Sequence, residues 1–282
     1  MHHDSSILVL GATGKTGRRV TARLEAAGHA VRAGSRSATP PFDWSDRATW
    51  PAVVDGAGAA YIAYVPDLAF PGAADDVAAF ADLAVRSGVS RLVLLSGRGE
   101  DRALAGERAV RESGAEWTVV RASWFLQNFS EHFLTDAIVA GELALPVGDV
   151  LEPFIDADDI ADVAVAALTT SAHLGTVVEV TGPRLLSFAD VVDEISATIG
   201  RDVRYVAVSP AAFTAAMTAA GLPPGEAADL TDLFTSVLDG RNASLTDGVE
   251  RALGRPARDI REWASATAAT GVWDARPLQE TA

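Results

Sequence analysis

The stretch ILVLGATGKTG, residues 7–17, decides the fold of this chain. Residues 7–10 form an apolar run typical of a buried strand, and a helical pattern follows residue 17. Gly11 permits a tight turn, Gly14 lets the backbone approach a phosphate, and Gly17 lets helix and strand pack closely. Such a turn directs N–H groups and a helix N-terminus at a pyrophosphate. We therefore predict a dinucleotide site, with Thr13, Lys15 and Thr16 beside the three glycines.

Short apolar segments alternate with helical patterns through the first half of the chain. Strands separated by helices favour parallel pairing with right-handed crossovers. The sequence therefore predicts an α/β fold with a doubly wound parallel Rossmann sheet, whose ligand lies at the C-terminal strand ends. The predicted strands after the first are 31–34, 59–63, 92–95 and 117–120, and the predicted helices include 75–86 and 104–113.

The second half has a different pattern, mainly helical and broken by Gly- and Pro-rich turns. We predict a Rossmann domain over 1–150, with a strand and helix around 153–182 returning to it. Residues 183–282 are expected to form a smaller, mainly helical substrate lobe, with a substrate cleft between the two. The elements predicted here are helices 125–133, 160–168 and 187–199, strands 153–156, 177–180 and 202–208, and helices from 210 onward.

Composition excludes several classes of function. The net charge of −15 disfavours nucleic acid and anionic membranes as partners, and no apolar run is long enough to span a bilayer. Without cysteine there is no thiol chemistry, and the five histidines have no metal-binding spacing. No Gly-x-Ser-x-Gly elbow marks a serine hydrolase. We expect a cytoplasmic protein with a small-molecule substrate and no metal, and a homodimer as a candidate assembly.

The segment after the second predicted strand favours NADP over NAD. An NAD site usually places a carboxylate after the second strand to bind the ribose 2′-hydroxyl. Here the segment from residue 31 onward contains no acidic residue until Asp43. Ser35 and Arg36 instead suit a 2′-phosphate, because a guanidinium matches phosphate geometry. Asp43 could accept from the adenine amino group, or it could be an ordinary turn or cap residue.

These motifs resemble the NmrA-like group of atypical short-chain dehydrogenases/reductases, and within it the ergot-alkaloid branch of agroclavine and festuclavine dehydrogenases. The resemblance implies that the glycine loop, Ser35 and Arg36 hold NADPH and that Asp43 and Trp44 flank the adenine. It further implies that Ser96 and the Ser123–Trp124 segment border the nicotinamide. Tyr64, Val65 and Gly97, beside these positions, complete the predicted cofactor contacts. The segments that carry the resemblance are 42–44, 49–50, 94–96, 117–121, 124–129, 154–161 and 180–183.

One departure limits the chemistry. Mainstream short-chain dehydrogenases use a Tyr-x-x-x-Lys pair as acid, yet Lys15 is the only lysine here and no tyrosine lies four residues before it. The remaining candidates for catalysis are Tyr64, Ser96 and Trp124. Each also has a structural alternative: Tyr64 could be an amphipathic wall residue, Ser96 a helix-cap serine, and Trp124 a core aromatic. Glu100 is a further candidate carboxylate for moving a proton, unless it pairs with Arg98 or Arg102. The acids at 156, 158 and 159 are interpreted as helix N-terminal acids.

Two functions remain open. One is an NADPH-dependent reductase that transfers hydride to a small, largely apolar acceptor. An iminium needs no acid because hydride neutralises it, whereas a quinone or enone yields a weakly basic anion. The other is a catalytically silent NAD(P) sensor that regulates a partner, which requires different affinities for the two redox forms.

Overall fold

The computed structural model describes residues 6–131 and 134–274, which divide into two compact units. Unit 1 comprises Met1–Ser123, Ala157–Thr181 and Thr246–Ala257. Unit 2 comprises Trp124–Asp156, Gly182–Leu245 and Arg258–Ala282. The sequence predicted a first domain boundary at residue 150, whereas the first segment of unit 1 ends at Ser123. The chain then returns to unit 1 twice, over Ala157–Thr181 and Thr246–Ala257. The second return, Thr246–Ala257, was not expected.

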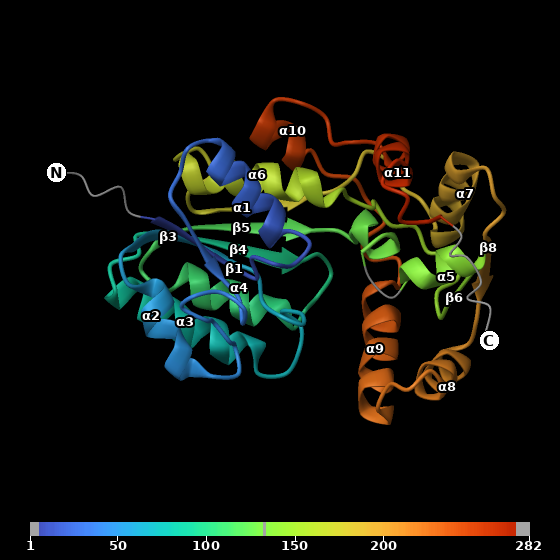
Figure 1. Cartoon of the computed structure of the whole chain (residues 1–282), viewed down its shortest axis with the longest axis horizontal. Helices are drawn as coiled ribbons and strands as arrows, with labels where there is room; N and C mark the ends of the chain where they lie inside the picture. The colour runs from blue at the N-terminus through green and yellow to red at the C-terminus, as the bar shows by residue number, and fades with distance from the viewer. Residues whose placement is uncertain (1–5, 132–133, 275–282) are drawn as a thin grey trace, which may run out of the picture. The chain divides into compact units, whose positions relative to one another are not determined.

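Unit 1 is built on a six-stranded parallel sheet in the order β2-β1-β3-β4-β5-β7 (Figure 1). The predicted doubly wound sheet is therefore confirmed. Because β2 and β3 lie on opposite sides of β1, the switch point of the sheet falls at the carboxyl ends of β1 and β3. The strands are β1 (Ser6–Leu10), β2 (Val31–Gly34), β3 (Ala57–Ile62), β4 (Arg91–Gly97), β5 (Glu116–Ala122) and β7 (Thr176–Val180).

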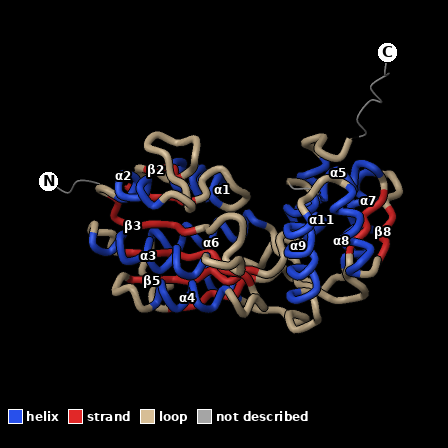
Figure 2. The backbone as a smooth tube through the Cα atoms, turned by 90° about the horizontal axis from the view of Figure 1, so that it is seen from below, coloured by secondary structure: helices blue, strands red, loops and turns tan. Residues whose placement is uncertain are grey.

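Helices cover both faces of this sheet, as Figures 1 and 2 show. On one face lie α1 (Gly17–Ala26) and α6 (Ala157–Thr169). On the other lie α2 (Trp50–Val54), α3 (Ala73–Arg86) and α4 (Ala103–Arg111), and α10 (Gly248–Leu253) packs beside α6 and β7. Strands buried on both faces read as continuous apolar runs, which is why the sequence located them. On the face toward α2, α3 and α4, strand side chains form a core with Trp50 and Phe80, both fully buried.

Unit 2 is mainly helical, with one parallel strand pair between β6 (Glu142–Leu145) and β8 (Arg204–Ala207). Its separate core contains Phe129, Phe154, Phe188 and Phe234. The predicted helix after Ser187 is confirmed, because the Ser187 hydroxyl and Asp190 form a reciprocal capping box. The helices are α5 (Leu134–Ala140), α7 (Phe188–Ile199), α8 (Pro210–Ala219), α9 (Pro224–Val237) and α11 (Ile260–Ala268).

Two predicted elements in this unit were wrong. The helix expected over 125–133 is a single 3₁₀ turn over Leu126–Phe129, and residues 132–133 lie outside the described part of the chain. The strand expected over 153–156 is reduced to isolated bridges, Phe125 with Ile155 and Glu152 with Leu186. Pro153 has no N–H to donate, so a continuous ladder cannot form there.

Candidate functional site

The glycine loop adopts the conformation that its spacing predicts. Gly11 has φ of 67°, and a β-carbon there would lie 3.2 Å from both Cβ and O of Ala63, just beyond β3. The Gly14 N–H donates to Gly11 O at 2.8 Å, which closes the turn. A β-carbon on Gly17 would lie 2.6 Å from Gly11 C, so only glycine fits the start of α1. The loop is therefore packed against the switch point of the sheet.

The outer rim of this loop is exposed to solvent, whereas its base is buried. Thr13 and Gly14 are exposed and Lys15 is half-buried, whereas Thr16 is buried directly before α1. The first N–H groups of a helix have no partner within the helix. The rim thus offers backbone donors, the positive end of α1 and one lysine to an anion.

Ser35 and Arg36 follow directly from the end of β2, which pairs with β1 in register Leu10 to Gly34. Arg36 is exposed, and the Ser35 and Ser37 hydroxyls lie 3.3 Å apart. The Asp43 carboxylate accepts from the N–H and the hydroxyl of Ser45 at 2.9 and 2.8 Å. These hydrogen bonds, with a smaller contribution from Arg36, lower the pKa of Asp43. The cluster combines a guanidinium and hydroxyls suited to phosphate.

Trp44 and Tyr64 pack against each other and against neighbouring aromatic side chains. The Trp44 side chain packs edge-on against Phe42, with ring centroids 4.9 Å apart, and is 8% exposed. Its ring centroid lies 4.8 Å from that of Tyr64. The Tyr64 hydroxyl donates to Asp76 at 2.9 Å. Val65, the next residue, is exposed. Trp44 as an adenine contact stays a prediction, and its ring offers little free surface for that role.

The same contacts make Tyr64 a weak acid. Burial and the neighbouring Asp76 carboxylate raise the pKa of Tyr64 to about 12. A useful general acid has a pKa near the working pH. The hydroxyl therefore fits a wall residue better than a proton donor.

Ser96 is engaged in a buried ion-pair network. It lies within β4, so the alternative of a helix-cap serine was wrong. Its hydroxyl donates to Glu107 at 2.6 Å, and Arg121 donates to the same carboxylate at 2.8 and 2.5 Å. Arg121 also pairs with Glu179 at 2.7 Å. The hydrogen bonds to Glu107, and to a smaller extent the one to Glu179, raise the pKa of Arg121 and keep its guanidinium charged.

Sequence reasoning missed this network. Glu107 stands on α4, the helix that carries the Tyr-x-x-x-Lys pair in mainstream relatives, and is 2% exposed. The signal was Arg121, an arginine at the end of an otherwise apolar strand. A guanidinium held partly out of water favours carboxylate partners, and the network supplies two, Glu107 and Glu179.

A second pair of acids lies at the carboxyl ends of β3 and β4. Glu100 follows β4 and Asp67 follows β3, the neighbouring strand in the sheet. The Glu100 carboxyl occupies the place where a β-carbon on Gly97 would stand, so it rests directly on the last residue of β4. Asp67 also accepts from the Ala69 N–H at 2.8 Å. Burial, the nearby Asp67 and the more distant Glu107 raise the pKa of Glu100 to about 8.

Ser123 and Trp124 fall at the junction in sequence between the two units. Ser123 is buried, and its N–H donates to Val180 O at 3.1 Å in unit 1. Trp124 belongs to unit 2, where its ring centroid lies 5.9 Å from Phe188 and 5.2 Å from Phe234. Its indole N–H is buried without a hydrogen-bond partner among the described residues. An unpaired buried donor is costly, which marks this position as one where a polar ligand atom would be favourable.

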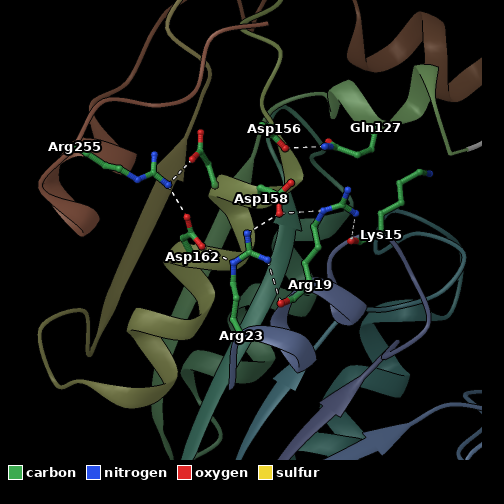
Figure 3. A network of polar contacts seen from close by, with 9 residues as sticks. Lys15, Arg19, Arg23, Gln127, Asp156, Asp158, Asp162 and Arg255 are labelled. Atoms are coloured by element: carbon green, nitrogen blue, oxygen red, sulfur yellow. Dashed lines mark hydrogen bonds and ion pairs between the residues drawn. The ribbon is translucent and has the colours of Figure 1, made fainter. Parts of the chain in front are cut away.

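An arginine–aspartate network fixes the helix that follows the glycine loop (Figure 3). Arg23 of α1 donates to Asp158 and Asp162 of α6, each at 2.5 Å. Arg255 pairs with Asp159 at 2.7 Å and with Asp162 at 2.5 Å. Asp158 and Asp159 lie in the first turn of α6, as predicted. These ion pairs hold α1, and with it the loop, against α6.

Within residues 6–131 and 134–274, no cluster of three or more His, Asp or Glu residues has metal-binding geometry. In the same part of the chain, every helix is too short or too polar to cross a bilayer. His2, His3 and His132, weighed in the sequence, lie outside the described residues.

Comparison with known proteins agrees with the resemblance drawn from the motifs. The model of the NmrA-like family matches residues 105–265. The chain belongs to the NmrA-like family. It is 34% identical to the NAD(P)H azoreductase of Xenophilus azovorans over 93% of this chain and 98% of the relative. It is 30% identical to the agroclavine dehydrogenase of Claviceps fusiformis over 92% and 96%.

The fold of this NmrA-like protein also matches solved structures. Citrobacter sp. triphenylmethane reductase complexed with NADP(H) superposes with a TM-score of 0.75 at 19% identity, over 93% of this chain and 99% of that one. Both predictions, the family and the similarity to the ergot-alkaloid branch, are confirmed.

Proposed function

We propose that this protein is an NADPH-dependent reductase that transfers hydride to a small, largely apolar acceptor such as an iminium, a quinone or an enone. The observation that carries the proposal is the full-length similarity to NAD(P)H-dependent reductases, together with a glycine loop whose packing admits no other residue at position 17. The relatives named NAD(P)H azoreductase and agroclavine dehydrogenase are oxidoreductases by name, which supports hydride transfer by this chain.

The residues present fit NADPH. The rim of the loop, with Thr13, Gly14 and Lys15, receives the pyrophosphate, because it presents N–H groups and a positive helix end. Ser35 and Arg36 receive the 2′-phosphate. When bound, the reduced nicotinamide supplies the hydride; the chain binds and orients it at the carboxyl ends of the strands. Unit 2, with Trp124 and its unpaired indole N–H, is assigned to acceptor binding.

The test separates the reductase from an NAD(P) sensor. The sensor is favoured by the absent Tyr-x-x-x-Lys pair and by the weak acidity of Tyr64. Calorimetric titration with NADPH, NADP⁺ and NADH, followed by a screen of iminium, quinone and enone acceptors for loss of NADPH absorbance, distinguishes the two. Turnover with any acceptor class supports the reductase. Binding that strongly prefers one redox form, without turnover, supports the sensor, and no binding of any nucleotide refutes both.

A further inference from the structure

An arginine in the first turn of α1 folds back onto the glycine loop. The Arg19 guanidinium donates from Nη1 to the carbonyl oxygen of Lys15 at 2.8 Å, and its Nε lies 3.4 Å from Oδ1 of Asp158 in the first turn of α6. Figure 3 shows this side chain running between Lys15 and Asp158. Asp158 is in turn paired with Arg23 at 2.5 Å, so the partner of Arg19 is itself fixed. The function proposed so far gives Arg19 no role.

The contact with the Lys15 carbonyl fixes the direction of the next N–H group. The peptide bond between Lys15 and Thr16 is trans, so the Lys15 C=O and the Thr16 N–H point in opposite directions. The carbonyl points along α1 toward Arg19, four residues later. The Thr16 N–H therefore points out of the helix N-terminus, the direction from which a phosphate approaches.

The start of α1 has no side-chain cap that would compete with a ligand. Thr16 is the N-cap residue, but its side chain makes no capping hydrogen bond, and the first turn of α1 contains no acidic residue. A capping side chain would accept from the second or third N–H of the helix. Anchoring of this end falls to Arg19, which holds a carbonyl and leaves the N–H side of the loop to an anion.

We propose that Arg19 is a positioning residue for the pyrophosphate: by bridging Lys15 O and Asp158 it holds the glycine loop in its binding conformation before the nucleotide arrives. This inference rests on the NADPH binding in the proposed function. Donors that are already ordered raise affinity, because binding does not have to order them. Arg19 thus serves the pyrophosphate and Arg36 the 2′-phosphate, so the two arginines act on different parts of one ligand.

The first measurement needs no nucleotide. Hydrogen–deuterium exchange, read by mass spectrometry on a peptide that contains residues 11–17, reports how often the loop opens. Arg19→Met keeps an unbranched side chain but loses both polar contacts, and we expect exchange about threefold faster or more than in the wild type. Arg18→Met removes the same charge from the exposed neighbouring position and should leave exchange unchanged.

The second measurement compares NADPH with adenosine 2′-monophosphate, which keeps the adenine and the 2′-phosphate but has no pyrophosphate. In titration calorimetry, Arg19→Met should weaken NADPH binding about tenfold or more, the loss expected for a group that orders charged hydrogen bonds. Its effect on adenosine 2′-monophosphate should stay within about threefold, as should the effect of Arg18→Met on both ligands. Arg36→Ala should weaken both ligands about tenfold or more.

Arg23→Met separates positioning of the loop from packing of α1 on α6. Arg23 donates to Asp158 and Asp162 at 2.5 Å, whereas its third contact, at 3.3 Å, is with the Arg19 carbonyl within α1. Its loss should therefore lower Tm more than Arg19→Met does, yet weaken NADPH binding less. The reverse order of the two variants in binding would assign the effect to helix packing and overturn the inference.

The results that would contradict this inference differ from those that would contradict the proposed function. Unchanged loop exchange in Arg19→Met shows that the arginine does not hold the loop, even if the wild type binds NADPH. Equal weakening by Arg19→Met and Arg18→Met shows that only net charge matters. Equal weakening of NADPH and adenosine 2′-monophosphate in Arg19→Met shows that the residue does not serve the pyrophosphate. A wild type that binds no NADPH refutes the proposed function, and the pyrophosphate role of Arg19 with it.

Discussion

Exchanging two glycines of the loop for alanine should separate folding from nucleotide binding. In Gly17→Ala the new β-carbon would lie 2.6 Å from Gly11 C and 3.0 Å from Ala12 Cα, with Gly11 O closer still. These are backbone atoms that no rotamer change can move. Such overpacking costs about 3 kcal/mol, and the better helix propensity of alanine offsets roughly 1 kcal/mol. A net loss of about 2 kcal/mol lowers Tm by roughly 4–8 °C in a protein of this size.

Gly14→Ala is the matched comparison. Its β-carbon would meet only Gly11 O, at 3.2 Å, and would otherwise point into solvent from an exposed position. We therefore expect Tm to change by less than about 2 °C, while the methyl group blocks the approach of the pyrophosphate and weakens NADPH binding by tenfold or more, about 1.4 kcal/mol. Differential scanning calorimetry and titration calorimetry on the same samples give both numbers. An unchanged Tm in Gly17→Ala, or unchanged affinity in Gly14→Ala, would refute this account of the loop.

Three further outcomes are expected. Arg36→Ala should weaken NADPH binding by about 10- to 100-fold and leave NADH binding unchanged in calorimetric titration, since one charged hydrogen-bond partner of the 2′-phosphate is lost; equal losses would contradict the assignment to NADP. Arg255→Met should lower the free energy of unfolding, measured with urea, by roughly 2–3 kcal/mol, because the Asp159 carboxylate is 0% exposed and stays buried after its ion pair with Arg255 is removed. Arg251→Met removes an exposed ion pair with Asp247 and should lower it by less than about 0.5 kcal/mol. Burial and the Asp67 charge raise the pKa of Glu100 from an ordinary 4.5 to about 8 in the folded chain, so the folded state binds more protons between these pH values and stability should fall as pH rises through this window. The fall should be absent in Glu100→Gln, and parallel stability profiles of the two proteins from pH 4.5 to 8 would refute it.

The parts of the fold that the sequence predicted are those set by neighbouring residues. The turn from β1 to α1 follows from three glycines spaced three apart, and the start of α7 follows from Ser187 and Asp190 in one capping box. Segment 125–133 was mistaken for a helix because its apolar residues have helical spacing. In the structure Phe129 instead packs against Phe154 and Phe188, distant in sequence, and the backbone makes only a 3₁₀ turn. A single-chain pattern cannot report which distant aromatic rings will compete for the same core.

The candidate site shows the same division. Positions in the glycine loop and after β2 were predictable because the ligand contacts there are mostly backbone groups and one short segment. The surroundings of Ser96 and Tyr64 were not, because their partners Glu107 and Asp76 come from helices that the sheet brings to them. Asp67 and Glu100 lie in loops that follow β3 and β4, two strands that are neighbours in the sheet. Neither loop contains a motif that would indicate the other.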